Sequence, residues 1–165
     1  MEHLFLTGQV GVGKSTLLRR LVEAHAWNLG GFASLWLPEQ TGRALWLTPY
    51  GADPRTGWVA AREDGQGRTV FPEAFDCAAR LLTAAPGTDW LIADELGIFE
   101  RNSPAFQQAV LAALDGDVPM LGVIKPKHTA FLDAVRAHPA VRLYTVTPEN
   151  RETLFQTLNA LLACE

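Results

Sequence analysis

The residues with the clearest chemical potential lie near the start of the chain, in the segment "GQVGVGKST". Its first eight residues fit the pattern G-x-x-x-x-G-K-[ST]. Glycines let successive backbone N–H groups of such a loop point at one anion, and the helix that follows adds the positive end of its dipole. Lys14 could reach the β- and γ-phosphates of a nucleotide, and Ser15 could offer its hydroxyl to Mg²⁺.

The spacing therefore predicts a phosphate-binding loop, with the side chain of Lys14 exposed at the phosphate site. We expect the whole loop to contact a nucleotide through Gly8, Gln9, Val10, Gly11, Val12, Gly13, Lys14, Ser15 and Thr16.

A second polar group, Asp94 and Glu95, ends the apolar run of "WLIADELG". Ligands of open α/β sheets bind outside the carboxyl ends of the strands. Asp94 could there hold Mg²⁺ through water, beside the hydroxyl of the loop. Glu95 could orient and deprotonate an attacking water. Residues 94–97 also fit D-x-x-G, a pattern seen in switch GTPases, but no N-K-x-D element for guanine follows, which argues against a guanine-specific switch.

The elements that must position these groups can be predicted from periodicity and turn residues. Residues 4–6 are predicted to form a short buried strand and residues 15–27 a helix, which the glycines of residues 28–31 would end. Strand-like runs separated by "EQTG" and "GADPRTG" then predict an antiparallel meander.

Helices and strands alternate in the second half of the chain, which predicts a parallel sheet with helices on both faces. The predicted strands are "WLIADELG", "VPMLGVIK" and "VRLYTV". The predicted helices cover residues 73–85, 104–114, 128–137 and 147–163. Ser103 would be the N-cap of the second of these, with Pro104 in its first turn. The meander would extend one edge of the sheet or form a small flap.

Length and composition indicate one α/β domain over residues 1–165. Hydrophobic residues make up 48% of the 165 residues, enough for a sizeable core. The formal charge of −4 argues against a broad basic face for nucleic acid. No apolar run approaches about 18 residues, so no membrane span is expected. Cys77 and Cys164 lack metal-ligand spacing, and we expect reduced thiols in a cytoplasmic protein.

Four segments together resemble a known family. They are "TGQVGVGKSTL", the pair Gly31-Phe32, "DELGIFERNSPAF" and "VTPENRETL", whose order and spacing cover nearly the whole chain. The chain resembles the THEP1 family of small P-loop nucleoside-triphosphatases. The resemblance implies a RecA-like core and Mg²⁺-dependent hydrolysis of ATP, GTP and other nucleoside triphosphates with little base preference.

The resemblance also implies roles for individual residues. Residues 8–16 would bind phosphate and Mg²⁺, Asp94 would hold the Mg²⁺ shell through water, and Glu95 would be the water-activating base. Residues 92–99 would lie beside the nucleotide. The chain departs from the family pattern at Ile98, where a lysine is usual, at residues 33–35, where acids often follow "GF", and at residues 9–10, where prolines are common. We expect these departures to affect substrate range and rate more than phosphate binding.

Four cations are weaker candidates. Arg151 could approach a phosphate, but its place near the start of a late helix favours a structural role. Lys125 and Lys127 follow the strand "VPMLGVI" and could sense the γ-phosphate or be exposed loop residues. Arg101 could stabilise transition-state charge. The strand tryptophans are expected to cover a sheet face: Trp36, Trp46 and Trp58.

Three functions remain open at this point. The leading one is a hydrolase that converts a nucleoside triphosphate to the diphosphate and phosphate with water as the nucleophile. A small-molecule kinase would use Asp94 or Glu95 to accept a proton from an acceptor hydroxyl, but no cluster of arginines suggests a lid. A nucleotide-dependent interaction module, working through a protein partner, would not need Glu95. Phosphate release without an added acceptor separates the first function from the other two.

Overall fold

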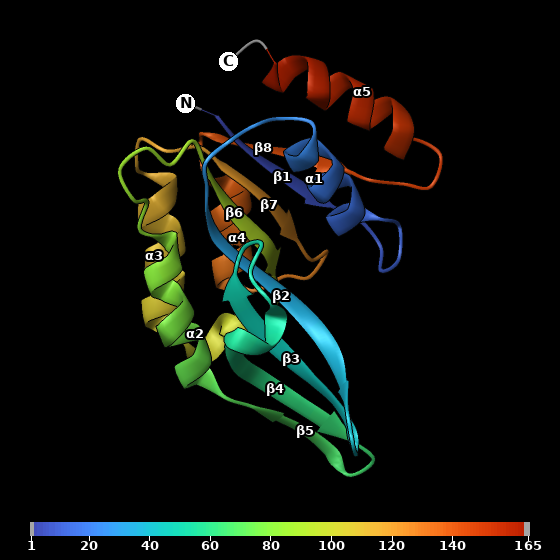
Figure 1. Ribbon diagram of the computed structural model, residues 1–165, viewed down its shortest axis with the longest axis vertical. Coiled ribbons are helices and arrows are strands. Elements are labelled where there is room, and N and C mark those ends of the chain that lie inside the picture. Colours follow the sequence, from blue (N-terminus) through green and yellow to red (C-terminus); the bar gives the residue numbers. More distant parts are fainter. Residues whose placement is uncertain (1, 164–165) are drawn as a thin grey trace.

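The computed structural model describes residues 2–163, so Cys164 and the end of the predicted single domain lie outside the described residues. Within this range the strands form one eight-stranded sheet in the order β5-β4-β3-β2-β6-β7-β1-β8 (Figure 1). The strands are β1 (His3–Thr7), β2 (Leu29–Glu39), β3 (Gly42–Pro49), β4 (Trp58–Asp64), β5 (Gly67–Val70), β6 (Trp90–Leu96), β7 (Met120–Ile124) and β8 (Val141–Thr145). The helices are α1 (Lys14–Glu23), α2 (Pro72–Ala78), α3 (Pro104–Leu114), α4 (Ala130–Ala137) and α5 (Arg151–Leu162).

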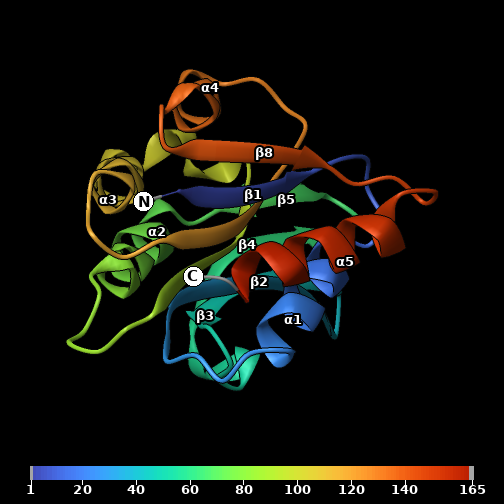
Figure 2. The same ribbon diagram turned by 90° about the horizontal axis from the view of Figure 1, so that it is seen from above.

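The five strands β2, β6, β7, β1 and β8 pair in parallel. Strands β1 and β7 are buried at every position, because helices cover both faces of the sheet at its centre. Figure 2 shows α1 and α5 on one face and α2, α3 and α4 on the other. Each face has its own core: Phe75 and Phe106 pack on one, and Leu18 and Leu158 on the other. This is the predicted three-layer α/β sandwich with a mainly parallel sheet.

The predicted meander is also confirmed. Strands β2 to β5 pair with their chain neighbours in antiparallel fashion and extend the sheet beyond β6. Of the two arrangements expected, the extension of one edge is therefore the one that forms. No helix within residues 2–163 has the length and apolar character needed to cross a membrane.

The first helix was predicted too long. It ends at Glu23, and the rings of His25 and Trp27 stack beyond it with their centroids 4.3 Å apart.

The glycines of residues 28–31 do not end the helix but lie at the start of β2. Gly31 has a φ of +91°, and a Cβ there would lie 2.0 Å from the carbonyl oxygen of Ile92. The glycine thus allows β2 to pair closely with β6, a contact that no local pattern could indicate.

Other helix boundaries shift for local reasons. The predicted helix 73–85 is α2 followed by a 3₁₀ segment over Ala79–Leu82. Helix α4 begins at Ala130 rather than residue 128, because the Thr129 hydroxyl accepts the backbone N–H of Leu132 and caps it. Ser103 is the N-cap of α3, but its hydroxyl donates to Asp76 at 2.6 Å and does not cap the helix.

The last helix begins later than predicted as well. Thr147 and Asn150 form a closed turn before α5: the N–H of Thr147 donates to the Asn150 side-chain oxygen at 2.8 Å, and the N–H of Asn150 donates to the Thr147 hydroxyl at 3.1 Å. Residues 147–150 are therefore a turn, and the helix starts at Arg151. This start brings Arg151 to the carboxyl edge of the parallel strands, where the candidate site lies.

Candidate active site

The glycine-rich loop joins the end of β1 to the start of α1. At its first residue, Gly8, the φ is +142°, and a Cβ would lie only 2.4 Å from the carbonyl oxygen of Val146. The N–H of Val146 in turn donates to the carbonyl of Thr7 at 2.7 Å. The loop is therefore packed against the end of the neighbouring strand β8, and a side chain at position 8 would prevent this packing.

Lys14 does not point into solvent as the sequence led us to expect. Its ammonium folds back and donates to the carbonyl oxygens of Gly8 and Gln9, both at 2.8 Å, which leaves the residue only 8% exposed. Burial lowers the pKa of Lys14, and the nearby charge of Lys125 adds to this effect, while Glu95 and Asp94 oppose it. The expected exposure was wrong because the loop itself supplies oxygen partners for the ammonium.

Ser15 and Asp94, 79 residues apart in the chain, meet at this edge. The Ser15 hydroxyl donates to Oδ1 of Asp94 at 2.7 Å. Asp94 lies near the end of β6, in register with Val123 of β7. Burial raises the pKa of Asp94 to about 6, and the charge of Glu95 adds to the rise, while the Ser15 hydrogen bond and Lys14 work against it. The first of the predicted juxtapositions, loop hydroxyl beside strand-end aspartate, is thus present.

The chemistry of these donors fits Mg²⁺. Ser15 and Asp94 present one hydroxyl and one carboxylate, the hard oxygen ligands that Mg²⁺ prefers. Among residues 2–163 no group of three or more His, Cys, Asp or Glu side chains could form a metal cage. Mg²⁺ commonly binds through one or two protein oxygens plus waters and substrate phosphates, so a pair of ligands beside a phosphate loop is a sufficient protein contribution.

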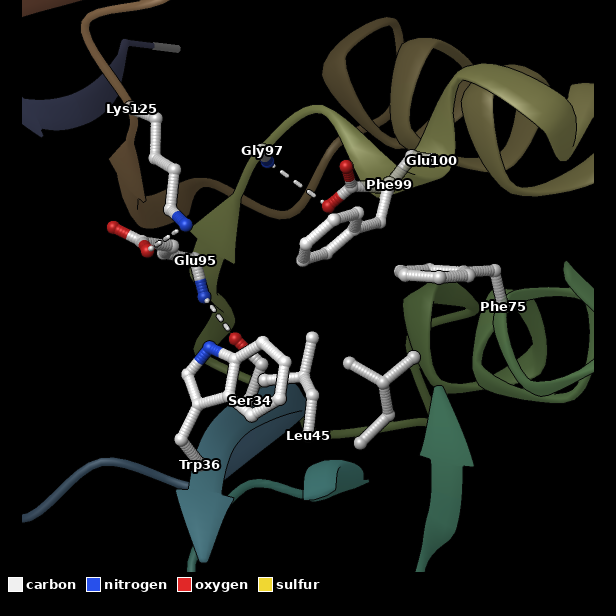
Figure 3. A pocket seen from close by; sticks show the side chains of 10 residues that line it. Ser34, Trp36, Leu45, Phe75, Glu95, Gly97, Phe99, Glu100 and Lys125 are labelled. Atoms are coloured by element: carbon white, nitrogen blue, oxygen red, sulfur yellow. Dashed lines mark hydrogen bonds and ion pairs between the residues drawn. The ribbon is translucent and has the colours of Figure 1, made fainter. Parts of the chain in front are cut away.

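Glu95 is held from both its backbone and its side chain (Figure 3). Its N–H donates to the hydroxyl of Ser34 at 3.0 Å, and that hydroxyl donates to the carbonyl of Asp94 at 3.2 Å. The Glu95 carboxylate forms an ion pair with Lys125, with Oε1 and Nζ 3.4 Å apart. Both side chains are partly exposed, Glu95 at 25% and Lys125 at 31%, so the carboxylate can be reached from solvent.

A small cavity of about 50 Å³ lies beside Glu95. Figure 3 shows that its aromatic and charged side chains come from β2, β6, the segment after β6, α2 and the residue that follows β7. Trp36, Phe75, Phe99, Glu100 and Lys125 are part of the lining. The candidate base, Glu95, thus lines the same cavity as the buried Glu100, a residue that the sequence did not suggest as part of the site.

Glu100 is 3% exposed, and its Oε1 accepts the N–H of Gly97 at 2.9 Å. Its Oε2 is buried and has no hydrogen-bond partner among the described residues. Burial raises the pKa of this carboxyl to about 7. Sequence reasoning missed Glu100 and Ser34. The only available signal for Glu100 was a glutamate among apolar residues shortly after the acidic pair, and for Ser34 there was none beyond its strand position.

Of the weaker candidates, some lie at the phosphate loop and others lie away from it. Nη1 of Arg151 lies 3.8 Å from the position that a Cβ on Gly13 would occupy, so Arg151 lies over the phosphate loop rather than serving only the last helix. Lys127 is exposed. Arg101 is exposed too, and within residues 2–163 no hydrogen bond or ion pair joins it to the acidic pair. Trp36 and Trp58 pack against the core, as expected of tryptophans on a sheet face.

Comparison with known proteins agrees with this arrangement. A family model described as NTPase matches residues 3–159. A nucleoside-triphosphatase THEP1 from Methanopyrus kandleri is 30% identical over 166 residues, covering 93% of this chain and 91% of that protein. A cancer-related nucleoside-triphosphatase homolog from Bos taurus is also 30% identical, covering 93% of this chain and 92% of that protein.

Two solved structures share the fold. The crystal structure of THEP1 from Aquifex aeolicus superposes with a TM-score of 0.78 at 23% identity, covering 98% of this chain and 99% of that chain. The solution structure of a human cancer-related nucleoside triphosphatase gives a TM-score of 0.70 at 26% identity, covering 98% and 97%. The family match spans almost the whole chain and the folds agree, so this chain belongs to the THEP1 family of NTPases.

Proposed function

We propose that this protein hydrolyses nucleoside 5′-triphosphates to the diphosphate and phosphate, in a Mg²⁺-dependent reaction with little base preference. The observation that carries the proposal is the 2.7 Å hydrogen bond between Ser15 and Asp94, which joins the phosphate loop to the acidic pair. Glu95 follows Asp94 directly, so a proton acceptor lies next to the position of the phosphates. The printed names of the relatives, nucleoside-triphosphatase, support the same reaction class.

Each role in phosphoryl transfer falls to particular residues of this chain. The N–H groups of the loop and the ammonium of Lys14 bind the β- and γ-phosphates, after Lys14 exchanges its two loop carbonyls for phosphate oxygens. Glu95 accepts a proton from a water, whose oxygen forms a bond to the γ-phosphorus as the bond to the β-phosphate oxygen breaks. Ser15 and Asp94 would hold Mg²⁺, which when bound neutralises charge on the phosphate oxygens.

The size of the cavity beside Glu95 favours water over a larger nucleophile. Its volume of about 50 Å³ accommodates water-sized molecules, whereas ligand pockets typically measure about 300–1,000 Å³. A kinase would need room there for an acceptor that carries the hydroxyl. The cavity thus favours hydrolysis over the small-molecule kinase.

A phosphate-release assay with ATP, GTP, CTP and UTP, with and without Mg²⁺, tests the proposal. We expect Mg²⁺-dependent release from all four nucleotides with no acceptor added. Nucleotide binding without acceptor-free release would contradict hydrolysis and favour the kinase or the interaction module. Release that is unaffected by chelation of divalent ions would contradict the role given to Ser15 and Asp94.

A further inference from the structure

Glu100 is a buried carboxyl to which the hydrolysis described above gives no role, although it lines the same small cavity as Glu95. The residue is 3% exposed, and its Oε1 accepts the N–H of Gly97 at 2.9 Å. Its Oε2 is buried and has no hydrogen-bond partner among residues 2–163. An unpaired oxygen in a protein interior is costly, so this atom points to a partner that enters the cavity.

The backbone holds Glu100 at the cavity wall. Its carbonyl accepts the N–H of Ser103 at 2.9 Å and the side-chain amide of Gln107 at 2.8 Å. The 3₁₀ segment Phe99–Asn102, which contains Glu100, also packs against α2 and α3. The segment is therefore anchored independently of Oε2, which leaves this oxygen free for another role.

Water is the partner that fits the cavity. The volume of about 50 Å³ exceeds the roughly 10–15 Å³ that one water requires. A buried water needs about two to four polar partners, and the lining supplies them with the carboxyls of Glu95 and Glu100 and the ammonium of Lys125 (Figure 3). A Cβ on Gly97 would lie 3.3 Å from Cδ of Lys125 and 3.7 Å from Oε2 of Glu100, so the bare glycine leaves these two side chains close together.

Of the polar side chains in the described lining, Glu100 is the one that can take up a proton from Glu95. The ammonium of Lys125 and the indole of Trp36 are donors only. The hydroxyl of Ser34 is already paired, since it accepts the N–H of Glu95 and donates to a backbone carbonyl. Oε2 of Glu100 is therefore the acceptor that remains.

The position of the substrate makes a second acceptor useful. Glu95 is 25% exposed, and the nucleotide and the attacking water must approach it from this open side. With the nucleotide bound, the cavity remains as the route by which Glu95 can pass its proton on. Burial raises the pKa of Glu100 to about 7, so near neutral pH its carboxyl can both accept a proton and return it.

Burial dominates the protonation of Glu100. Backbone N–H groups and Lys125 lower its pKa and Glu95 raises it, each by less than burial does. Helix α3, which packs against the segment of Glu100, carries no charged residue. Asp76 of α2 and Arg68 of β5 are each bound to other partners. The protonation of Glu100 therefore depends on the cavity and on the two charges that share it.

We propose that Glu100 receives, through water in the small cavity, the proton that Glu95 removes from the attacking water. The proposal rests on the proposed function, which makes Glu95 the base. Glu95 becomes neutral as the water oxygen bonds to the γ-phosphorus. It then gives its proton to a cavity water, which gives one of its own protons to Oε2 of Glu100, so Glu95 is again a carboxylate. After product release the proton returns to solvent by the same path. Glu100 thus supports the base without touching the nucleotide.

The test is the pH dependence of single-turnover ATP hydrolysis at saturating Mg²⁺ in the parent, Glu100→Gln and Glu73→Gln. The amide of Glu100→Gln keeps an acceptor for the N–H of Gly97 but cannot take up the proton. Glu73 is the matched control, because it is exposed on α2, the helix that contributes Phe75 to the lining. We expect the rate of the parent to rise as the pH increases through about 7, since Glu100 must be ionised to accept a proton.

Glu100→Gln should be slower than the parent by about tenfold at about pH 8.5 and should match it at about pH 5.5, where the parent's carboxyl already holds its proton. Its profile should show no inflection near pH 7, whereas Glu73→Gln should follow the parent throughout. If the parent and Glu100→Gln differ by the same factor at every pH, the role of Glu100 is structural and the relay is overturned.

Gly97→Ala keeps the carboxyl of Glu100 and serves as a second variant if Glu100→Gln fails to fold. Its methyl group would lie between Lys125 and Oε2 of Glu100, crowd the water there and cause the same loss of rate above about pH 7. A parent that hydrolyses ATP without an inflection near pH 7 would overturn the relay alone. A parent that releases no phosphate at any pH would overturn the proposed function, and the relay with it.

Discussion

Nζ of Lys125 lies 3.4 Å from Oε1 of Glu95. Lys125 directly follows β7, the strand between β6 with its acidic pair and β1 with its phosphate loop. Its backbone N–H donates to the carbonyl of Leu96 at 2.9 Å, which fixes the residue beside the acidic pair. The ammonium thus restrains the proposed base and places a positive charge next to the expected position of the γ-phosphate.

Lys125→Ala should therefore lower kcat by about 10²–10³, the usual effect of losing one preorganised donor at a developing negative charge. Lys127→Ala is the matched control, because Lys127 follows two residues later and is exposed. Steady-state phosphate release measures both. Equal rates for the two variants would contradict a role for the Lys125–Glu95 pair in turnover.

Lys14→Ala should weaken ATP binding by about 10² or more, because it removes the one side-chain charge within the phosphate loop. The ammonium contacts only backbone carbonyls of its own loop, so the core packing does not depend on it. Calorimetric titration with ATP measures the affinity, and thermal unfolding followed by circular dichroism serves as the folding control. An unchanged affinity in a folded variant would refute the phosphate-loop assignment.

Base preference should be weak. We expect kcat/KM for ATP and GTP to agree within about a hundredfold, since a single poorly matched contact is worth only about 1–3 kcal/mol. The sequence supports this expectation, because it contains no N-K-x-D element that would offer a carboxylate to guanine. A preference of about ten-thousandfold for one base would contradict this expectation and reveal a pocket that reads the edge of the base.

Glu100 makes stability dependent on pH. Its pKa is about 7 in the folded protein, whereas a glutamate in an unfolded chain has its ordinary pKa of 4.5, so above pH 4.5 the unfolded chain loses the proton first. The folded state then holds more protons than the unfolded state, and stability falls as the pH rises from 4.5 through 7. Glu100→Gln keeps an acceptor for the N–H of Gly97 and removes the buried charge.

We therefore expect Glu100→Gln to be more stable than the parent at pH 8.5, by up to about 3 kcal/mol, and to match it at pH 4.5. Glu149→Gln at an exposed position is the control and should have no such pH-dependent effect. Urea unfolding at the two pH values gives the free energies. A difference from the parent of the same size at both pH values would exclude ionisation of Glu100 as the cause.

The layered fold could be predicted because its signals are local. Buried runs such as β1 and β7 show apolar character at every position, and the turn residues between the meander strands separate them along the chain. The motif G-x-x-x-x-G-K-[ST] and the position of Asp94 at a strand end also sufficed to predict that Ser15 and Asp94 meet. The parallel order of strands places both at one edge of the sheet.

The remainder depends on contacts between distant segments. From the local sequence Gly31 was interpreted as a helix terminator. Its actual role is to let β2 approach Ile92 of another strand, a contact that the local sequence does not show. Arg151 looked structural, yet the turn before α5 carries it to Gly13, 138 positions earlier in the sequence. Burial of Glu100 without a partner for Oε2 follows from packing around the small cavity. Local periodicity contains no information on such pairings.

Glu95→Gln and Asp94→Asn should separate the two carboxylates. The amide of Glu95→Gln cannot accept a proton from water, so single-turnover hydrolysis of ATP at saturating Mg²⁺ should fall by about 10²–10⁴. Nucleotide affinity should stay within about a few-fold, because Ser15, Asp94 and the phosphate loop are untouched.

Asp94→Asn should instead raise the Mg²⁺ concentration needed for half-maximal rate, since a neutral amide attracts the ion less than a carboxylate does. The parent should show a related effect of pH. Its Asp94 has a pKa of about 6, so protonation below that value removes the same charge and should increase the Mg²⁺ requirement. In Asp94→Asn this pH dependence should disappear. If parent and Glu95→Gln hydrolyse ATP at the same rate, Glu95 is not the base, and Asp94 or a residue from a partner must accept the proton.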